Sequence, residues 1–235
     1  MIKTNSLGIL SQFYFNVRDS FKSIYQNSNF YEKKISKTYE NNFEYKPSPH
    51  LLSSIVKYQN KKYKIEDFAI ESIWQNNLNP KDYEKLNNFF WFFSLDLKSS
   101  KKTTQTVIKN WISNNNKFQK KSWEFDLTAK RIISWLSNHQ LTYEDSDQAY
   151  RSTFDHMIQK QTNHLLNEIK SSKEIENKMI GCAAIILTGL AYKNEKQYLL
   201  NGLNLLKNII KSSLDNQGFP KSRNIRQLIF YLKYF

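Results

Sequence analysis

Apolar residues recur at three- and four-residue steps along most of this 235-residue chain, and this is the spacing of one face of an α-helix. The chain has only five Gly and four Pro, too few for the many turns of an all-β protein of this size, so an all-α fold is predicted. A helix packed on other helices and a helix lying on a membrane surface both show such a stripe. The first stripe is Leu10, Phe13, Tyr14, Val17, Phe21, Ile24 and Tyr25.

From residue 79 onward the helical pattern is continuous. Asn79 is a suitable N-cap and Pro80 suits a first helical turn. Asp126 is predicted to cap another helix in the same way. The residues 89–93 are all aromatic, too apolar to face water on any side. The other predicted helices lie around 107–112, 126–136, 148–169, 179–191, 198–210 and 225–232, with a turn at 214–220.

Two segments in the first third break the pattern. Residues 32–44 are polar and charged, and Pro47 and Pro49 follow, which predicts a connector. Apolar and polar residues partly alternate over 58–74, which predicts short strands or an irregular extended segment. We therefore divide the chain into an N-terminal helix and connector at 1–50 and a helical domain at 51–235.

The chain shows no sign of a disulfide framework, a metal site or a membrane span. Its single cysteine, Cys182, lies in the apolar run 179–191, where a buried thiol is expected. That run has 13 residues, whereas a spanning helix needs about 20. The four histidines lack HxxxH or HExxH spacing, so neither a metal nor another cofactor is expected. No signal peptide is visible, which by default favours the cytoplasm.

The formal net charge of +14 suggests a polyanionic partner. However, 30 of the 35 basic residues are Lys and only five are Arg, the residue that phosphate and base readers favour. No helix-turn-helix, zinc-finger or aromatic RNA-binding motif is found, which disfavours nucleic acid. A basic helical protein that binds nucleic acid, or a helical scaffold for another protein, is the alternative to the interpretation given next.

Six short motifs stand in a fixed order between about residue 74 and residue 235. They are LNNFFWFFSLDL, VIKNWI, SWEFDLTAKRIISWLSNH, QKQTNHLL, NKMIGCAAIILTGLAY and LDNQGFPKSR. In this order they resemble the helical N-terminal domain of heparinase II/III-like proteins, especially the bacterial members. The resemblance implies an incomplete (α/α) toroid of antiparallel helix pairs. In that family a β-sandwich domain follows the toroid, so we expect a longer protein in which that domain lies beyond Phe235.

Characterised members of the family are polysaccharide lyases that cleave uronate-containing glycans by β-elimination. When the uronate carboxylate is neutralised, a base can remove the C5 proton while an acid protonates the C4 oxygen. The resemblance thus implies an acidic polysaccharide partner, a carbon–oxygen lyase activity in the complete protein and, by analogy, a periplasmic location as the alternative to the cytoplasm. Lyases of the family carry a Tyr-His pair near the place of Arg226 and Gln227 here, so this chain alone is expected to be inactive.

The resemblance assigns two residues to the catalytic region. Asn177 corresponds to the family's asparagine that hydrogen-bonds the uronate carboxylate. It is also a candidate N-cap for the helix that follows, and the two roles are compatible. Lys178 stands where many relatives have a His or an aromatic residue; it can pair with a carboxylate but cannot serve as the same acid or base.

The remaining candidates are substrate-binding residues. Trp123, Arg131 and Trp135 are expected near one helix start, where aromatic faces stack on sugar rings and Arg grips a carboxylate or sulfate. The competing interpretation places both Trp in the core and pairs Arg131 with a buried acid. Arg223 and Arg226 are expected either to line the same groove or to lie on a solvated surface.

Overall fold

The computed structural model describes residues 6–38, 43, 78–95, 100–172, 174–192 and 196–234. Two predictions fall outside these ranges. They are the proline-containing part of the connector, with the proposed domain boundary at residue 50, and the extended segment at 58–74.

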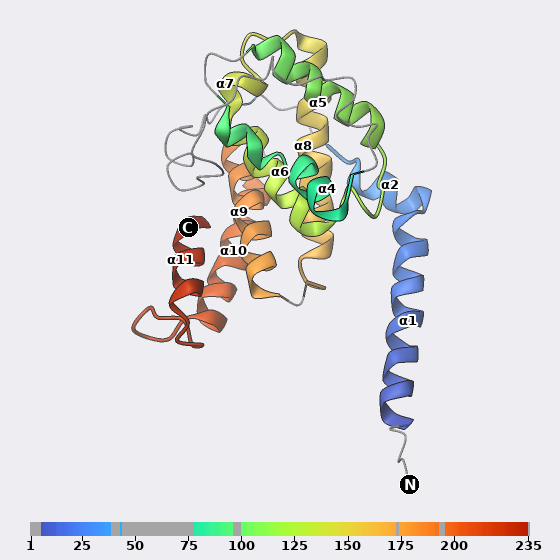
Figure 1. Ribbon diagram of the computed structural model, residues 1–235, viewed down its shortest axis with the longest axis vertical. Coiled ribbons are helices and arrows are strands. Elements are labelled where there is room, and N and C mark those ends of the chain that lie inside the picture. Colours follow the sequence, from blue (N-terminus) through green and yellow to red (C-terminus); the bar gives the residue numbers. More distant parts are fainter. Residues whose placement is uncertain are drawn as a thin grey trace.

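The described part of the chain is helical, as predicted, and its two β-bridges are isolated ones. None of its helices is both long and apolar enough to cross a bilayer. Figure 1 shows that consecutive helices in the lower half of the body run in opposite directions. In chain order they are α1 Ser6–Gln26, α2 Asn29–Ile35, α4 Pro80–Asn87, the 3-10 helix η3 Phe90–Ser94, α5 Lys101–Asn115, α6 Phe125–Ser137, α7 His139–Thr142, α8 Gln148–Glu168, α9 Ile175–Ala191, α10 Lys196–Ser213 and α11 Ile225–Tyr234.

Helix α9 is the centre of the helical body and packs between α6 and α10. Its sequence explains this position, because small residues let neighbouring backbones come close. A Cβ at Gly189 would lie 2.4 Å from the backbone N of Leu199 in α10, and one at Gly181 would lie 2.3 Å from Cζ of Phe125 at the start of α6. The predicted buried thiol is confirmed: Cys182 is fully buried and its Sγ donates to the Gly202 carbonyl at 3.3 Å.

Side-chain caps fix several helix starts. Asn79 accepts from the backbone N of Asp82 at 3.0 Å and Pro80 opens α4, as predicted. Ser100 and Asp147 cap α5 and α8 in the same way. The prediction for Asp126 is wrong, because α6 begins one residue before it, with Glu124 at the N-cap position and no side-chain cap bond.

The aromatic run at 89–93 is folded more tightly than an α-helix. Phe89 has a left-handed φ of 58° and the chain then makes the 3-10 helix η3. This turn buries Phe89 and Phe92 against α5 and α6, where the Phe89 ring meets the rings of Trp111 and Trp135 edge-on. The five aromatic residues thus form the centre of the core, although Trp91 stays partly exposed.

The predicted connector at 32–44 begins too early, because α2 continues to Ile35. This short helix is bound to the body by the fully buried side chains of Tyr31 and Ile35 and by an ion pair between Glu32 and Lys160 of α8. Helix α1 behaves differently, since most of its length extends away from the body (Figure 1).

Candidate functional site

The residues predicted to bind sugar around the start of α6 lie inside the protein. Arg131 and Trp135 are fully buried and Trp123 is 1% exposed. The ring of Trp135 packs against Phe89, Trp111 and Phe154. Neither tryptophan is exposed enough to offer a face to a sugar ring, so the core interpretation holds for both.

Arg131 binds protein oxygens in every direction. Its Nε donates to Gln161 Oε1 at 2.9 Å, and its terminal nitrogens donate to the carbonyls of Asn87 at 2.9 Å and Ser122 at 3.0 Å. The guanidinium carbon lies 3.9 Å from the centre of the Trp111 ring. These partners are neutral, so the prediction that Arg131 pairs with a buried acid is wrong. Burial lowers the pKa of Arg131 to about 9, which still leaves it charged at neutral pH.

His164, in the QKQTNHLL motif, belongs to the same buried network. Its Nδ1 lies 2.7 Å from the Tyr31 hydroxyl and its Nε2 lies 2.9 Å from the Trp123 carbonyl. Burial lowers its pKa to about 4, so the ring is neutral at pH 7. Since a carbonyl only accepts, Nε2 carries the hydrogen and Nδ1 accepts from Tyr31. His164 therefore connects α8 to α2 and to the turn before α6.

Asn177 and Lys178 lie in the first turn of α9, and both are partly exposed. The N-cap position belongs to Glu174, so the capping prediction for Asn177 is wrong. Instead, the Asn177 amide nitrogen donates to Glu174 Oε2 at 3.0 Å. This bond holds the Asn177 side chain at the start of the helix, where backbone N–H groups favour an anion.

The predicted turn after α10 is an ordered hairpin-like loop. Asp215 Oδ1 accepts from the backbone N of Gln217 and of Phe219, both at 2.9 Å, and these bonds lower the pKa of Asp215. Gly218 has a φ of 81°, which favours glycine. An isolated bridge between Leu214 and Pro220 closes the loop.

The loop is strongly basic. We call residues 211–226 the basic turn, because its charged residues are Lys211, Lys221, Arg223 and Arg226 against the single acid Asp215. All four basic side chains are exposed. The guanidinium of Arg223 pairs with Asp215 at 2.8 Å. Lys221 Nζ donates to the Lys211 carbonyl at 2.9 Å, which holds this lysine over the end of α10.

Packing brings the basic turn to the end of the body where α9 begins. Met179 near the start of α9 and Ile209 near the end of α10 lie in one apolar cluster with Tyr231 of α11. Ile175 and Leu214 pack against that cluster. The antiparallel pair therefore places two of the predicted regions, the start of α9 and the basic turn, at the same end (Figure 1).

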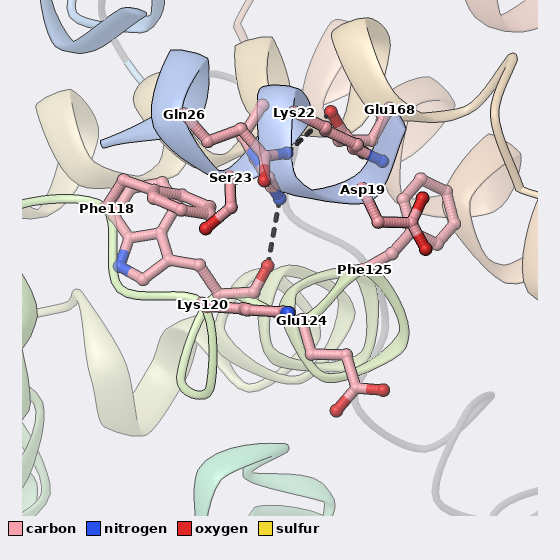
Figure 2. A pocket seen from close by; sticks show the side chains of 11 residues that line it. Asp19, Lys22, Ser23, Gln26, Phe118, Lys120, Glu124, Phe125 and Glu168 are labelled. Carbon is pink, nitrogen blue, oxygen red and sulfur yellow. Dashed lines mark hydrogen bonds and ion pairs between the residues drawn. The ribbon is translucent and has the colours of Figure 1, made fainter. Parts of the chain in front are cut away.

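A hollow of about 290 Å³ lies elsewhere, between α1 and the chain that leads into α6 (Figure 2). Helix α1 forms one wall and Glu168 at the end of α8 borders it. Sequence reasoning missed it, because no motif joins α1 to α6. It is lined by Asp19, Lys22, Ser23, Gln26, Phe118, Lys120, Trp123, Glu124, Phe125, His164 and Glu168.

The charges in this hollow are mixed and largely paired. Lys22 forms an ion pair with Glu168, whose Oε1 also accepts from the Gln26 amide at 2.8 Å. Burial, with the nearby carboxylates of Asp126 and Glu84, raises the pKa of Glu124. Three acids face two lysines here. The hollow therefore offers no net positive field to an acidic ligand, unlike the basic turn.

A second feature that the sequence did not indicate is the carboxyl group of Asp155 in α8. It accepts hydrogen bonds from the hydroxyls of Tyr143 at 2.9 Å and Tyr192 at 2.7 Å. Burial raises its pKa to about 6, although both hydrogen bonds and Arg151 act in the opposite direction. These contacts tie α8 to the residues after α7 and α9, which is a structural role.

No group of three or more His, Cys, Asp or Glu suited to a metal ion occurs among the residues that the structure describes. In comparisons with known proteins, no family model, no curated protein and no solved structure matches the chain. The site is therefore defined by its own chemistry: a partly exposed amide and lysine at the start of α9, beside an exposed turn rich in Lys and Arg.

Proposed function

We propose that the chain is a helical domain that binds an acidic, uronate-containing polysaccharide at the end of the body formed by the start of α9 and the basic turn. The observation that carries the proposal is the packing of α9 against α10, which puts these two regions at one end of the body. They are separated by more than 30 residues in the sequence. In the family that the sequence resembles, the corresponding two motifs serve the same substrate.

The chemistry of the residues suits a chain of carboxylates. Arg226 is exposed at the start of α11 and offers the planar fork that pairs with a carboxylate or sulfate. Lys221 and Lys211 add positive charge close by, and Asn177 offers an amide of the kind that hydrogen-bonds a carboxylate. Trp123, Arg131 and Trp135 have no part in this site, because they are buried.

A toroid arrangement of the helices, and a lyase activity in a longer protein that carries this domain, are the finer parts of the same proposal. They rest on the resemblance. The chain holds no tyrosine at the place near Arg226 where the family's lyases have one, so we propose binding, and no turnover, for the 235 residues themselves.

The test is a calorimetric titration of the whole chain with polygalacturonate, an unsulfated uronate polymer. Replacing Arg223 and Arg226 together by Ala is expected to raise the Kd about tenfold or more, since each can form a charge-assisted contact. The matched control is Lys102→Ala with Lys109→Ala, which removes two exposed charges from α5, where neither side chain touches the site.

Equal losses in the two double variants would mean that the net charge alone attracts the polymer and would contradict a site. Equally tight binding of duplex DNA, lost in the same variants and falling steeply with salt, would favour the nucleic-acid alternative. Heparin in a parallel titration tests whether sulfate strengthens binding.

A further inference from the structure

Helix α1 is attached to the body by its polar side. Lys22 pairs with Glu168 and also donates to Ser171 Oγ at 3.2 Å, and Gln26 donates to Glu168. Asp19 and Ser23 line the hollow on the same side (Figure 2). An amphipathic helix normally turns its apolar side to the core. In α1 the orientation is reversed, because its polar side contacts the body.

Several large apolar residues of α1 consequently face away from the body. Phe21 and Ile24 are each 69% exposed, and Tyr14 is 65% exposed. Phe13 on the same helix is 68% exposed, and Phe30 in α2 is 69% exposed. Isolated exposed apolar residues are ordinary, but a continuous row of large ones marks an interaction surface.

The spacing of this row is that of a coiled coil. We call the row the α1 seam; its positions follow one another at steps that alternate between three and four residues, which gives the 3.5-residue repeat of helices that pair side by side. None of its positions carries a charge. The α1 seam consists of Leu7, Leu10, Tyr14, Val17, Phe21 and Ile24.

We propose that the α1 seam pairs with the α1 seam of a second copy of this chain, so that the two helices form a two-stranded coiled coil that joins two bodies. Helix α1 has 21 residues, which is about 30 Å of contact at 1.5 Å per residue. Most of the helix extends away from the body (Figure 1), and Tyr14, Phe21 and Ile24 of the seam are exposed.

The exposed apolar area of α1 reaches the lower limit for a specific, weak dimer. A large aromatic side chain buries about 150–250 Å² when fully covered, and about two thirds of that is still exposed at Tyr14 and Phe21. With Phe13 and Ile24 included, each copy can bury on the order of 500 Å², or about 1,000 Å² for the two copies together. A total of about 1,000 Å² is the lower limit for a specific interface and is typical of weak ones.

The charges beside the seam favour a second copy over a lipid surface. Helices that lie on anionic membranes carry free Lys and Arg on their polar side. In the described part of α1, Arg18 pairs with Asp19 and Lys22 pairs with Glu168. The other polar side chains there, such as Asn16 and Ser20, are neutral. Little unpaired positive charge is thus left to attract lipid phosphates.

Sedimentation equilibrium of the full 235-residue chain tests the proposal. The wild type is expected to pass from monomer to dimer between about 1 and 100 µM, the weak end of the range for interfaces of this size. Phe21→Glu and Ile24→Glu, made separately, are each expected to weaken the dimer at least about 100-fold, because each buries a charge in the seam. Asn16→Glu is the matched control: it adds the same charge to an exposed position of α1 outside the seam and should leave the Kd within about twofold.

Circular dichroism shows whether each variant keeps the helix content of the wild type, which we expect because both seam residues are exposed. A wild type that stays monomeric at every concentration overturns the proposal. Cosedimentation with vesicles of phosphatidylcholine and phosphatidylserine is measured alongside; a monomer that binds these vesicles through Phe21 and Ile24 assigns the surface to lipid and also overturns it. A dimer that persists in both seam variants places the interface elsewhere and also overturns the proposal.

Discussion

Helices α1 and α6 have similar amphipathic sequences but opposite places in the molecule. The apolar side of α6 is covered completely, and even the charged Arg131 within it is fully buried and bonded to oxygens of α4, α8 and the turn before α6. The apolar side of α1 is open, while its polar side binds the body. A stripe of apolar residues thus identifies the side of a helix that can be covered, but it does not determine whether the body covers that side.

The two regions also differ in how their polar groups are used. Around α6, polar side chains such as Gln161 and His164 hold the core together through specific hydrogen bonds. On α1, the polar contacts with Glu168 hold a helix whose apolar side is free. We therefore expect substitutions around α6 to change the folding of the chain, and substitutions on the outer side of α1 to change its association.

The largest effect is expected when Arg131 is removed. Arg131→Ala leaves a cavity beside Trp111 and unpaired oxygens at Asn87 and Ser122, so the free energy of unfolding should fall by about 3–5 kcal/mol. Urea unfolding followed by circular dichroism measures it. Arg18→Ala is the control on α1, with an expected change within about 0.5 kcal/mol because its ion pair is exposed. Similar losses in the two variants would erase the contrast between the regions.

The next effect concerns pH and the Asp155 carboxyl. Its folded pKa of about 6 lies above the ordinary value of 3.8, so between these pH values the folded protein binds more protons than the unfolded one. Stability therefore falls as the pH rises through this window, by up to about 3 kcal/mol. Asp155→Asn removes this fall.

The Asp155 measurement is a comparison of unfolding free energies of wild type and Asp155→Asn from pH 4 to pH 7. His164, with its pKa lowered to about 4, acts in the opposite direction in the same window. The stabilising contribution of its neutral ring to the folded protein is lost as the pH falls. Its contribution is common to both proteins and cancels in the difference. A difference that stays flat across the window would contradict the burial of the Asp155 charge.

A third effect tests the close approach of α9 and α10. Gly189→Ala would place a Cβ 2.4 Å from the Leu199 backbone, which forces the two helices apart and should cost about 2 kcal/mol or more. Gly218→Ala is the comparison: nothing lies within 4 Å of its Cβ, and only its φ of 81° opposes the change, at about 1 kcal/mol. Thermal unfolding of both variants shows which one loses more stability. A smaller loss in Gly189→Ala than in Gly218→Ala would contradict the close packing of α9 and α10.

The smallest effect on stability is expected at the outer side of α1. Phe21→Ala should change the unfolding free energy by less than about 0.5 kcal/mol in dilute, monomeric protein, since Phe21 is mostly exposed. Phe154→Ala, in the core, should cost about 3–5 kcal/mol. The pair separates exposure from residue type, because both changes remove the same ring.

Local signals predicted the helices well. The cap at Asn79 and the proline after it fix the start of α4 from sequence alone, and the buried Cys182 follows from the small and apolar residues around it. The sequence places the cap of α6 at Asp126, two residues after the N-cap position of Glu124. It assigns residues 32–35, the second half of α2, to a connector, because the polar residues there hide the two buried side chains Tyr31 and Ile35. A seven-residue helix of this kind is stabilised by its contacts with α8, which local sequence does not contain.

The candidate site was predicted in part. The sequence singled out Asn177, Lys178, Arg223 and Arg226, and the helix packing puts their two segments at one end. It also singled out Trp123, Arg131 and Trp135, which are buried. Arg and Trp occur both in binding grooves and in cores, so residue type could not separate the two. The hollow beside α1 had no local signal, because its walls come from helices more than 90 residues apart.

The sequence alone determined that this chain is helical, which side of each helix is apolar, and that the chain is strongly basic. These properties follow from residue spacing and residue chemistry. The tertiary structure alone decided that Arg131 is enclosed, that the basic turn lies beside the start of α9, and that α1 binds the body through its polar side. The physical reason is that periodicity specifies a surface to be covered, whereas what covers it depends on contacts between residues far apart in the chain.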